Sequence, residues 1–175
     1  MDIFLIGIIS YLMGSIPFGF ILTKIFLKKD IRDIGSGNIG ATNALRTGNK
    51  TLGYSTLILD ILKSVAPVIY VKFFYQEYLY IASLSVFLGH VFPIWLKFKG
   101  GKGVATYLGI LFAINFYFGI IFTFSWFLTF FISKYSSLSS LVGAASVPIY
   151  LLILTQFDQG IFFLIMFVLI FFTHR

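Results

Sequence analysis

Two glycine-rich polar segments stand out in a chain that is otherwise almost continuously apolar. The first covers residues 35–46 and the second covers residues 99–106. Glycine leaves backbone N–H groups approachable, and the neighbouring Ser, Asn, Lys and Arg side chains add donors and positive charge. These residue types predict a binding site for an anion, and we expect the anion to be a phosphate group.

The first segment also has a purely structural interpretation. Ser36, Asn38 and Asn43 could satisfy free N–H groups at turns and helix starts, as such side chains commonly do. Three glycines within six residues, at 35, 37 and 40, together with Arg46, exceed what a turn requires. We therefore favour the functional interpretation.

The second segment contains Gly-Gly-Lys-Gly, which is similar to the end of a nucleotide-binding P-loop. That motif requires Ser or Thr after the Lys, but Gly103 follows Lys102 here and no strand is indicated before it. The pattern disfavours a nucleotide site. We expect a phosphate nest at the start of a helix from Val104, with Lys102 neutralising the anion.

Composition places both segments in a membrane protein. The 175 residues are 59% hydrophobic and 11% charged, and a soluble domain of this length could not bury that much apolar surface. The net charge of +7 does not come from a basic run interleaved with aromatics, so we expect no nucleic-acid partner. The absence of cysteine excludes disulfides and thiolate metal sites.

The apolar sequence divides into six segments. They cover residues 3–27, 52–74, 79–96, 104–133, 138–155 and 160–173. The first is too long for a cleaved signal, whose apolar part has ~7–15 residues, and we expect it to be a retained span. Segment 104–133 would form a helix of ~45 Å, which is too long for one untilted pass. Asn115 and Gly119 could mark a turn between two short spans.

Basic residues favour two spans in that segment, because cytoplasmic loops collect Lys and Arg. With the N-terminus outside, the cytoplasmic side then holds Lys24, Lys28, Lys29, Arg32, Arg46, Lys50, Lys97, Lys99, Lys102, Lys134 and Arg175. Only Lys72 falls near the outer face, whereas a single span would move Lys134 and Arg175 outside. We predict one all-α integral membrane domain over residues 1–175, a seven-helix bundle of short spans with a cytoplasmic C-terminus. Both glycine-rich segments and the serine-rich turn at 134–140 then meet at one face.

Asp60, Lys63 and His90 lie within the apolar segments. A lone histidine such as His90 is more often a structural hydrogen-bonder than a catalyst, and no second ligand at a suitable spacing supports a metal. Asp60 and Lys63 share one helix face, and charges at membrane depth usually pair inside a bundle. We expect a structural ion pair that shapes the site indirectly.

Taken together, residues 35–46, then Gly-His-Val-Phe-Pro at 89–93 leading into 98–106, resemble the bacterial acyl-phosphate:glycerol-3-phosphate acyltransferases, the PlsY family. The resemblance covers nearly the whole chain. It implies an enzyme that transfers a fatty acyl group from acyl phosphate to glycerol 3-phosphate. The products would be 1-acyl-glycerol 3-phosphate, or lysophosphatidate, and phosphate, at the start of phospholipid synthesis.

The resemblance also implies residue roles. The catalytic residues would be Ser36, Lys102, Ser140 and His174. The substrate-binding residues would be Gly37, Asn38, Asn43, Arg46, His90, Gly100, Gly101, Gly103, Thr106 and Ser137. Because an acyl phosphate is already an activated mixed anhydride, positioning and charge stabilisation suffice, and neither metal nor cofactor is implied.

The same resemblance implies a multi-pass protein of the bacterial inner membrane, with its active site at the cytoplasmic face. Its partners would be acyl phosphate, glycerol 3-phosphate and membrane lipid, with functional coupling to an enzyme that forms acyl phosphate. The alternative is a non-catalytic binder or transporter of phosphorylated lipids, although no internal repeat indicates transport. The family's last motif continues to an Asn beyond Arg175, so we expect a truncated or divergent copy that binds acyl phosphate but transfers slowly.

Overall fold

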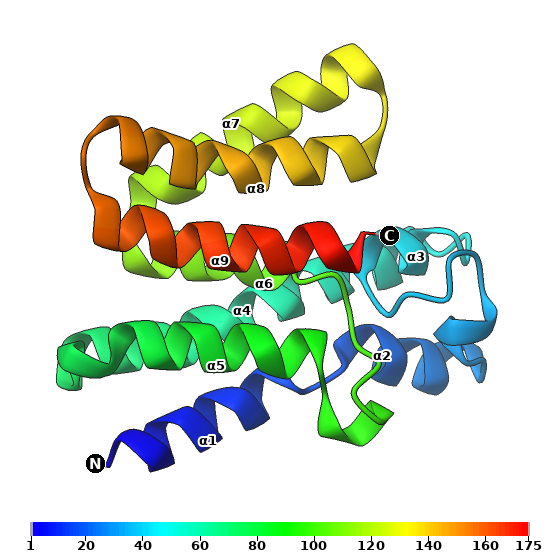
Figure 1. Ribbon diagram of the computed structural model, residues 1–175. Coiled ribbons are helices and arrows are strands. Elements are labelled where there is room, and N and C mark those ends of the chain that lie inside the picture. Colours follow the sequence, from blue (N-terminus) through cyan, green and yellow to red (C-terminus); the bar gives the residue numbers. More distant parts are fainter. Residues whose placement is uncertain (1, 175) are drawn as a thin grey trace.

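The computed structural model describes residues 2–174, and within them it is helical without any strand (Figure 1). The helices are α1 (Ile3–Gly14), α2 (Phe18–Leu27), α3 (Ala41–Leu45), α4 (Lys50–Phe74), α5 (Leu79–Val91), α6 (Val104–Ile114), α7 (Phe116–Ser133), α8 (Ser136–Ile153) and α9 (Phe157–Thr173). Short 3₁₀ helices cover Ile31–Asp33, Gln76–Tyr78 and Ile94–Leu96. The predicted all-α fold is confirmed.

Successive long helices run in alternating directions through one bundle, as Figure 1 shows. The described chain begins at one end of the bundle, and α9 finishes at the other. That second end also holds the end of α2, the start of α4, the loop before α6 and the start of α8. Both glycine-rich segments, the serine-rich turn and His174 therefore lie at the same end.

The long segment 104–133 is broken at Asn115, one of the two residues expected to mark a turn. Asn115 has an extended backbone, and its side chain accepts a hydrogen bond from the Tyr117 N–H at 2.9 Å. Gly119, the other candidate, lies inside α7. The segment thus forms two helices, α6 and α7, as the charge distribution favoured.

A second break divides segment 3–27, which we expected to be one retained span. Helix α1 ends at Gly14 and α2 begins at Phe18. Pro17 lies between them, and proline lacks an N–H and disfavours a helical conformation in the residue before it. The two helices still form one apolar stretch long enough to span a membrane.

Four stretches of the described chain are long and apolar enough to cross a membrane. They are Ile3–Leu27, Gln76–Leu96, Phe116–Ser133 and Ser136–Ile153. Helices α6 and α9 are apolar but shorter, and α4 carries Asp60, Lys63 and Lys72 along its 25 residues. Phe124, Phe127 and other large apolar side chains of α7 are exposed, which is typical of a surface that faces lipid. The number of spans and their orientation stay predictions.

The largest apolar core of the described residues is formed by side chains from α4 to α9. Tyr107 is fully buried there, with the Phe122 and Phe163 rings 6.0 and 5.9 Å from its own. Its hydroxyl donates to the Ala144 carbonyl at 3.3 Å. Because Tyr107 lies in the first turns of α6, this packing also fixes the start of α6 and the glycine-rich segment before it.

Replacing Lys72 by Met should destabilise the end of α6. The Lys72 Nζ donates to the Ala113 and Ile114 carbonyls at 3.1 and 2.8 Å, groups that the helix end leaves without internal partners. We expect a loss of about 1–2 kcal/mol, because a hydrogen bond to a charged group is removed at a half-buried site. Thermal unfolding in detergent measures it, and an unchanged melting temperature would show that water satisfies these carbonyls.

Candidate active site

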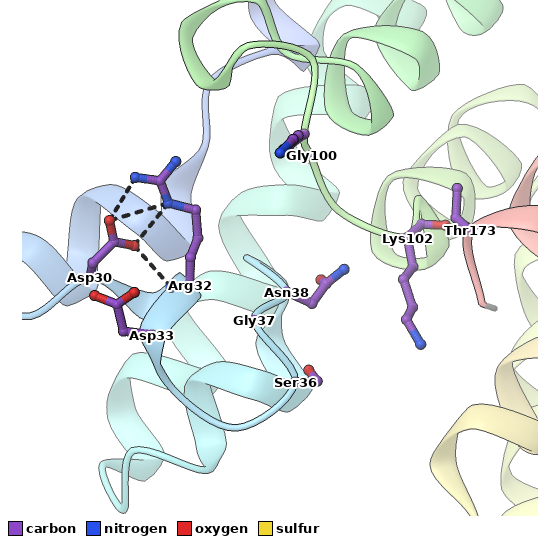
Figure 2. Close-up of a pocket in the computed structure, with 10 residues that line it drawn as sticks. Asp30, Arg32, Asp33, Ser36, Gly37, Asn38, Gly100, Lys102 and Thr173 are labelled. Carbon is purple, nitrogen blue, oxygen red and sulfur yellow. Dashed lines mark hydrogen bonds and ion pairs between the residues drawn. The ribbon is translucent and has the colours of Figure 1, made fainter.

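A polar cavity of about 570 Å³ opens between the two glycine-rich segments (Figure 2). Its lining combines donors, charges and glycines from the loop after α2, the loop before α6 and the end of α9. The lining residues are Asp30, Arg32, Asp33, Ser36, Gly37, Asn38, Lys99, Gly100, Lys102 and Thr173. The volume is within the range of small-molecule sites in proteins.

Asn43 holds the first glycine-rich segment in shape. Its side chain is almost fully buried, and its Oδ1 accepts from the Ser36 N–H at 2.9 Å. Its Nδ2 group donates to the carbonyls of Ile31, Ile34 and Asn38 at 3.0, 2.9 and 2.8 Å. The structure therefore places the Asn43 amide inside the loop and not on the cavity. We expect Asn43 to position the loop, and its substrate contact stays a prediction.

The glycines of this loop adopt conformations that other residues avoid. Gly35 and Gly37 have φ values of +56° and +70°, in the left-handed region that glycine occupies without strain. The resulting turn directs the Ser36 and Asn38 side chains toward the Lys102 side of the cavity (Figure 2). The sequence places these two polar groups on the cavity through the glycines around them.

The second glycine-rich segment lies directly on the end of α5. The Gly100 N–H donates to the Val91 carbonyl and the Gly101 N–H to the His90 carbonyl, both at 3.1 Å. A side chain at either glycine would overlap these neighbours. Gly103, with φ of +85°, then starts α6. The chain can approach α5 this closely because both positions lack a Cβ.

The end of α9 ties the same loop from the other side. The Thr173 hydroxyl donates to the Lys102 carbonyl at 3.1 Å and also to the Ile170 carbonyl at 2.7 Å. The Lys102 side chain extends from this tie into the cavity, opposite Ser36 and Asn38 (Figure 2). The end of α5 and the end of α9 thus hold the loop that carries Lys102.

Lys102 is an uncompensated cation. Within residues 2–174 no carboxylate lies within ion-pair distance of its ammonium. Partial burial, with a further contribution from the positive charge of Arg46, lowers the pKa of Lys102. Arg46 does not line the cavity but lies beside Gly35. A bound anion would relieve the repulsion between the two cations, so the electrostatics favour phosphate.

His174 lies next to Thr173 and presents a free ring nitrogen. Its Nδ1–H donates to the Ile170 carbonyl at 2.8 Å, which leaves Nε2 of the neutral ring as an acceptor. Burial lowers the pKa of His174, and the charge of Lys102 lowers it further although the carbonyl contact opposes this. His174 is therefore neutral near pH 7. Arg175 lies outside the described residues.

An ion pair forms one rim of the cavity and was missed by the sequence analysis. Arg32 grips Asp30 with two nitrogens, at 2.6 Å for Nη2 and 3.0 Å for Nε, and holds the pKa of Asp30 at about 2. The guanidinium also lies over the Phe20 ring. Asp30 therefore neutralises Arg32, whereas Lys102 has no such partner. The sequence signal was the Asp-Ile-Arg-Asp run just before the first glycine.

Other predicted site residues do not line the cavity. They are Asn43, Arg46, His90, Gly101, Gly103, Thr106, Ser137, Ser140 and His174. Ser140 is buried, donating to the Ser136 carbonyl at 2.9 Å and accepting from Trp126 at 3.3 Å, while Ser137 is exposed. Thr106 is fully buried, and among residues 2–174 its hydroxyl has no hydrogen-bond partner. The structure brings together Ser36, Gly37, Asn38, Gly100 and Lys102 and leaves the roles of the others as predictions.

Exposed apolar residues precede the second segment. Ile94, Trp95 and Phe98 are all largely exposed and alternate with Lys97 and Lys99. Trp95 is fixed through its indole N–H, which donates to Ser15 at 2.8 Å. Aromatic residues beside lysines are typical of the membrane–water interface. The cavity therefore adjoins a stretch suited to that interface.

The chain was compared with known proteins. Residues 4–175 match the family model described as glycerol-3-phosphate acyltransferase. The chain is 73% identical over 175 residues to a glycerol-3-phosphate acyltransferase of Pelagibacter ubique (strain HTCC1062), with all of this chain and 91% of the relative covered. A glycerol-3-phosphate acyltransferase of Mesorhizobium japonicum is 49% identical over 168 residues, covering 96% of this chain and 86% of the relative.

Solved structures agree with these sequence matches. The fold is similar to the crystal structure of PlsY (YgiH), an integral membrane glycerol 3-phosphate acyltransferase, in its glycerol 3-phosphate form. The TM-score is 0.92 at 34% identity, over 99% of this chain and 88% of that one. The lysophosphatidic acid form gives a TM-score of 0.87 over the same shares of the two chains.

Replacing Asn43 by Ala should loosen the first glycine-rich loop. The change removes four hydrogen bonds to buried or half-buried backbone groups, and we expect a cost of about 2–4 kcal/mol. Hydrogen exchange of residues 31–46 should accelerate. Asn49→Ala is the matched control, since Asn49 only caps the start of α4. Equal exchange of residues 31–46 in both variants would contradict the positioning role.

Proposed function

Since the chain belongs to the glycerol-3-phosphate acyltransferase family, we propose that the cavity between its two glycine-rich segments is the active site of that reaction. The protein is an integral membrane enzyme that transfers a fatty acyl group to glycerol 3-phosphate, and an acyl phosphate is the donor that fits the family. The observation that carries the site assignment is the unpaired Lys102 facing Ser36 and Asn38.

Binding comes first in the proposed mechanism. Lys102 and Arg46 attract the phosphate groups of the two substrates, and the first N–H groups of α6 add donors that have no partner within the helix. A charge-assisted hydrogen bond is about twice as strong as a neutral one. The cations therefore hold the substrates while Ser36 and Asn38 orient them.

Transfer then needs little more than correct placement. A glycerol hydroxyl attacks the acyl carbonyl carbon, the new ester C–O bond forms, and the C–O bond to the phosphate breaks. Ser36 or Lys102 stabilises the negative charge that develops on the carbonyl oxygen, and phosphate departs with the bonding electrons. The hydroxyl proton passes to the phosphate of the acceptor, so no strong protein base is required. His174 follows Thr173, whose hydroxyl contacts the Lys102 carbonyl, so the Nε2 atom of His174 is placed to accept a hydrogen bond from a substrate.

We further infer the setting of the enzyme. One domain over residues 1–175 crosses the bacterial inner membrane seven times, with the cavity at the cytoplasmic face. The location of most basic residues at the cavity end of the bundle supports this orientation. Because the donor is a reactive mixed anhydride, functional coupling to an enzyme that forms acyl phosphate would limit its loss to water.

Removing either cation should impair turnover more than folding. In an assay of purified protein with acyl phosphate and glycerol 3-phosphate, Lys102→Ala and Arg46→Ala should each lower kcat/KM by roughly 10–100-fold, equivalent to losing ~1.5–3 kcal/mol. Arg46→Lys should recover only part of the lost kcat/KM, because an ammonium cannot form the bidentate contact that a guanidinium makes with phosphate.

Two controls accompany this assay. Lys97 is exposed next to the Lys102 loop but does not line the cavity, so Lys97→Ala should retain activity. Acyl-CoA replaces acyl phosphate to test the donor. Near-normal turnover of Lys102→Ala in folded protein would remove Lys102 from the site, and phosphate-lipid binding without any transfer by the wild type would favour a non-catalytic binder.

Labelling of single cysteines tests the orientation, because the chain contains no native cysteine. Ser137 lies at the start of α8 and Glu77 in the connection between α4 and α5, and both are exposed. These two segments lie at opposite ends of the bundle (Figure 1). In intact cells an impermeant maleimide should label Glu77→Cys, but label Ser137→Cys only after permeabilisation. Labelling of position 137 from outside would overturn the cytoplasmic assignment of the cavity.

A further inference from the structure

A buried ionic cluster lies behind the second glycine-rich segment and takes no part in lining the cavity. It consists of Asp60, Lys63 and His90, whose side chains are 2–3% exposed. The Lys63 Nζ is 2.8 Å from the Asp60 Oδ1, and the His90 Nδ1 is 3.8 Å from that same oxygen. The three side chains thus meet around one carboxylate oxygen.

The imidazole of His90 directly supports the loop that carries Lys102. A Cβ on Gly101 would overlap the Nε2 and Cε1 atoms of the ring. The Gly101 N–H also donates to the His90 carbonyl at 3.1 Å. His90 therefore contacts Gly101 through both its side chain and its backbone, one residue before Lys102.

Lys63 connects the cluster to the break between α1 and α2. Its Nζ donates to the Ile16 carbonyl at 2.7 Å, a group within that break. The cluster therefore joins the break, α4, the end of α5 and the Lys102 loop. Within the described structure Asp60 Oδ1 has the Lys63 ammonium as its partner, whereas His90 Nδ1 has no hydrogen bond. Stability alone rarely explains such a cluster, because desolvation of buried charges offsets their attraction.

We propose that Asp60, Lys63 and His90 are positioning residues that fix the loop at 100–102 and thereby set where the Lys102 ammonium lies. Asp60 faces Nδ1 and orients the ring, Lys63 compensates the carboxylate, and the ring backs Gly101. This role replaces the direct substrate contact that the family resemblance implied for His90. The inference rests on the proposed function, because it concerns the phosphate-binding loop of that site.

A double-mutant cycle tests the contact between His90 and Gly101. Gly101→Ala should raise the KM of at least one phosphate substrate about tenfold, since its new methyl group collides with the ring and shifts the loop. His90→Ala should raise the same KM several-fold. In the double variant the methyl group has room, so its KM should not exceed that of Gly101→Ala. If the KM increases of the two single variants multiply in the double variant, the contact between His90 and Gly101 does not position the loop.

Gly109→Ala is the matched control for this cycle. Its new methyl group would overlap the Ser64 Oγ between α6 and α4, away from the loop. It should therefore lower the melting temperature and leave both KM values within about twofold of the wild type. A KM increase in Gly109→Ala equal to that in Gly101→Ala would show that the effect is general packing damage.

A second variant set tests the ion pair. Removing one partner leaves a buried charge uncompensated, so Asp60→Asn and Lys63→Met are combined. The double variant should fold but raise KM about three- to tenfold, because the carboxylate that faces His90 and the ammonium that compensates it are both removed. Lys72→Met, which removes another α4 lysine that donates to backbone carbonyls, should change the melting temperature without changing KM. A wild-type KM in the Asp60→Asn/Lys63→Met variant would overturn the pair's role.

Binding experiments separate this inference from the proposed function. Calorimetry of the full detergent-solubilised chain measures its affinity for glycerol 3-phosphate and, separately, for inorganic phosphate. Neither measurement requires acyl transfer. If the wild type binds these anions but transfers no acyl group, the proposed function fails and the cluster is still tested by affinity. Affinities unchanged in His90→Ala and in the Asp60→Asn/Lys63→Met variant would overturn the cluster proposal even when the wild type is fully active.

Discussion

Inside a membrane every backbone polar group must find its partner within the protein, and this constraint decides where the chain can be irregular. The α1–α2 break and the α6–α7 break both lie within the apolar bundle. At each break a lysine of α4 donates hydrogen bonds to backbone carbonyls. Lys63 donates to the Ile16 carbonyl at the α1–α2 break, and Lys72 donates to Ala113 and Ile114 before the α6–α7 break. Helix α4 thus acts as the central support that allows its neighbours to be interrupted.

The cavity follows the same rule at the end of the bundle. Its two loops are not α-helical, yet their backbone groups have partners. The Asn43 amide binds carbonyls of the first loop, and carbonyls at the end of α5 accept from N–H groups of the second. Glycines at 100 and 101 allow the second loop to come so close. The Asn38 Oδ1 accepts from the Gly40 N–H at 2.9 Å, which leaves the Asn38 Nδ2 group, Ser36 and Lys102 available for a ligand. Rigid loops with free side chains are what a reaction governed by positioning requires.

Much of this arrangement could be predicted from the sequence, because it depends on strong local signals. Apolar segments gave the long helices to within a few residues, and Asn115 marked a real break. The Asp60–Lys63 spacing gave a true ion pair. Side-chain direction within the loops could not be predicted, since a polar residue in a glycine-rich loop can turn inward or outward. Asn43 turns inward, and only the folded backbone, which carries the four groups it binds, decides this.

The exposed side chains at 94–98 are suited to the boundary between water and hydrocarbon, and the Lys102 loop follows them directly in the chain. Ile94, Trp95 and Phe98 suit the lipid side of that boundary, while Lys97 and Lys99 suit the aqueous side. A reaction located there lets a water-soluble acceptor and a lipid-soluble donor meet without either leaving its own phase. At the proposed site the acylated product would form beside the lipid, so the enzyme would need no separate step to deliver it to the membrane.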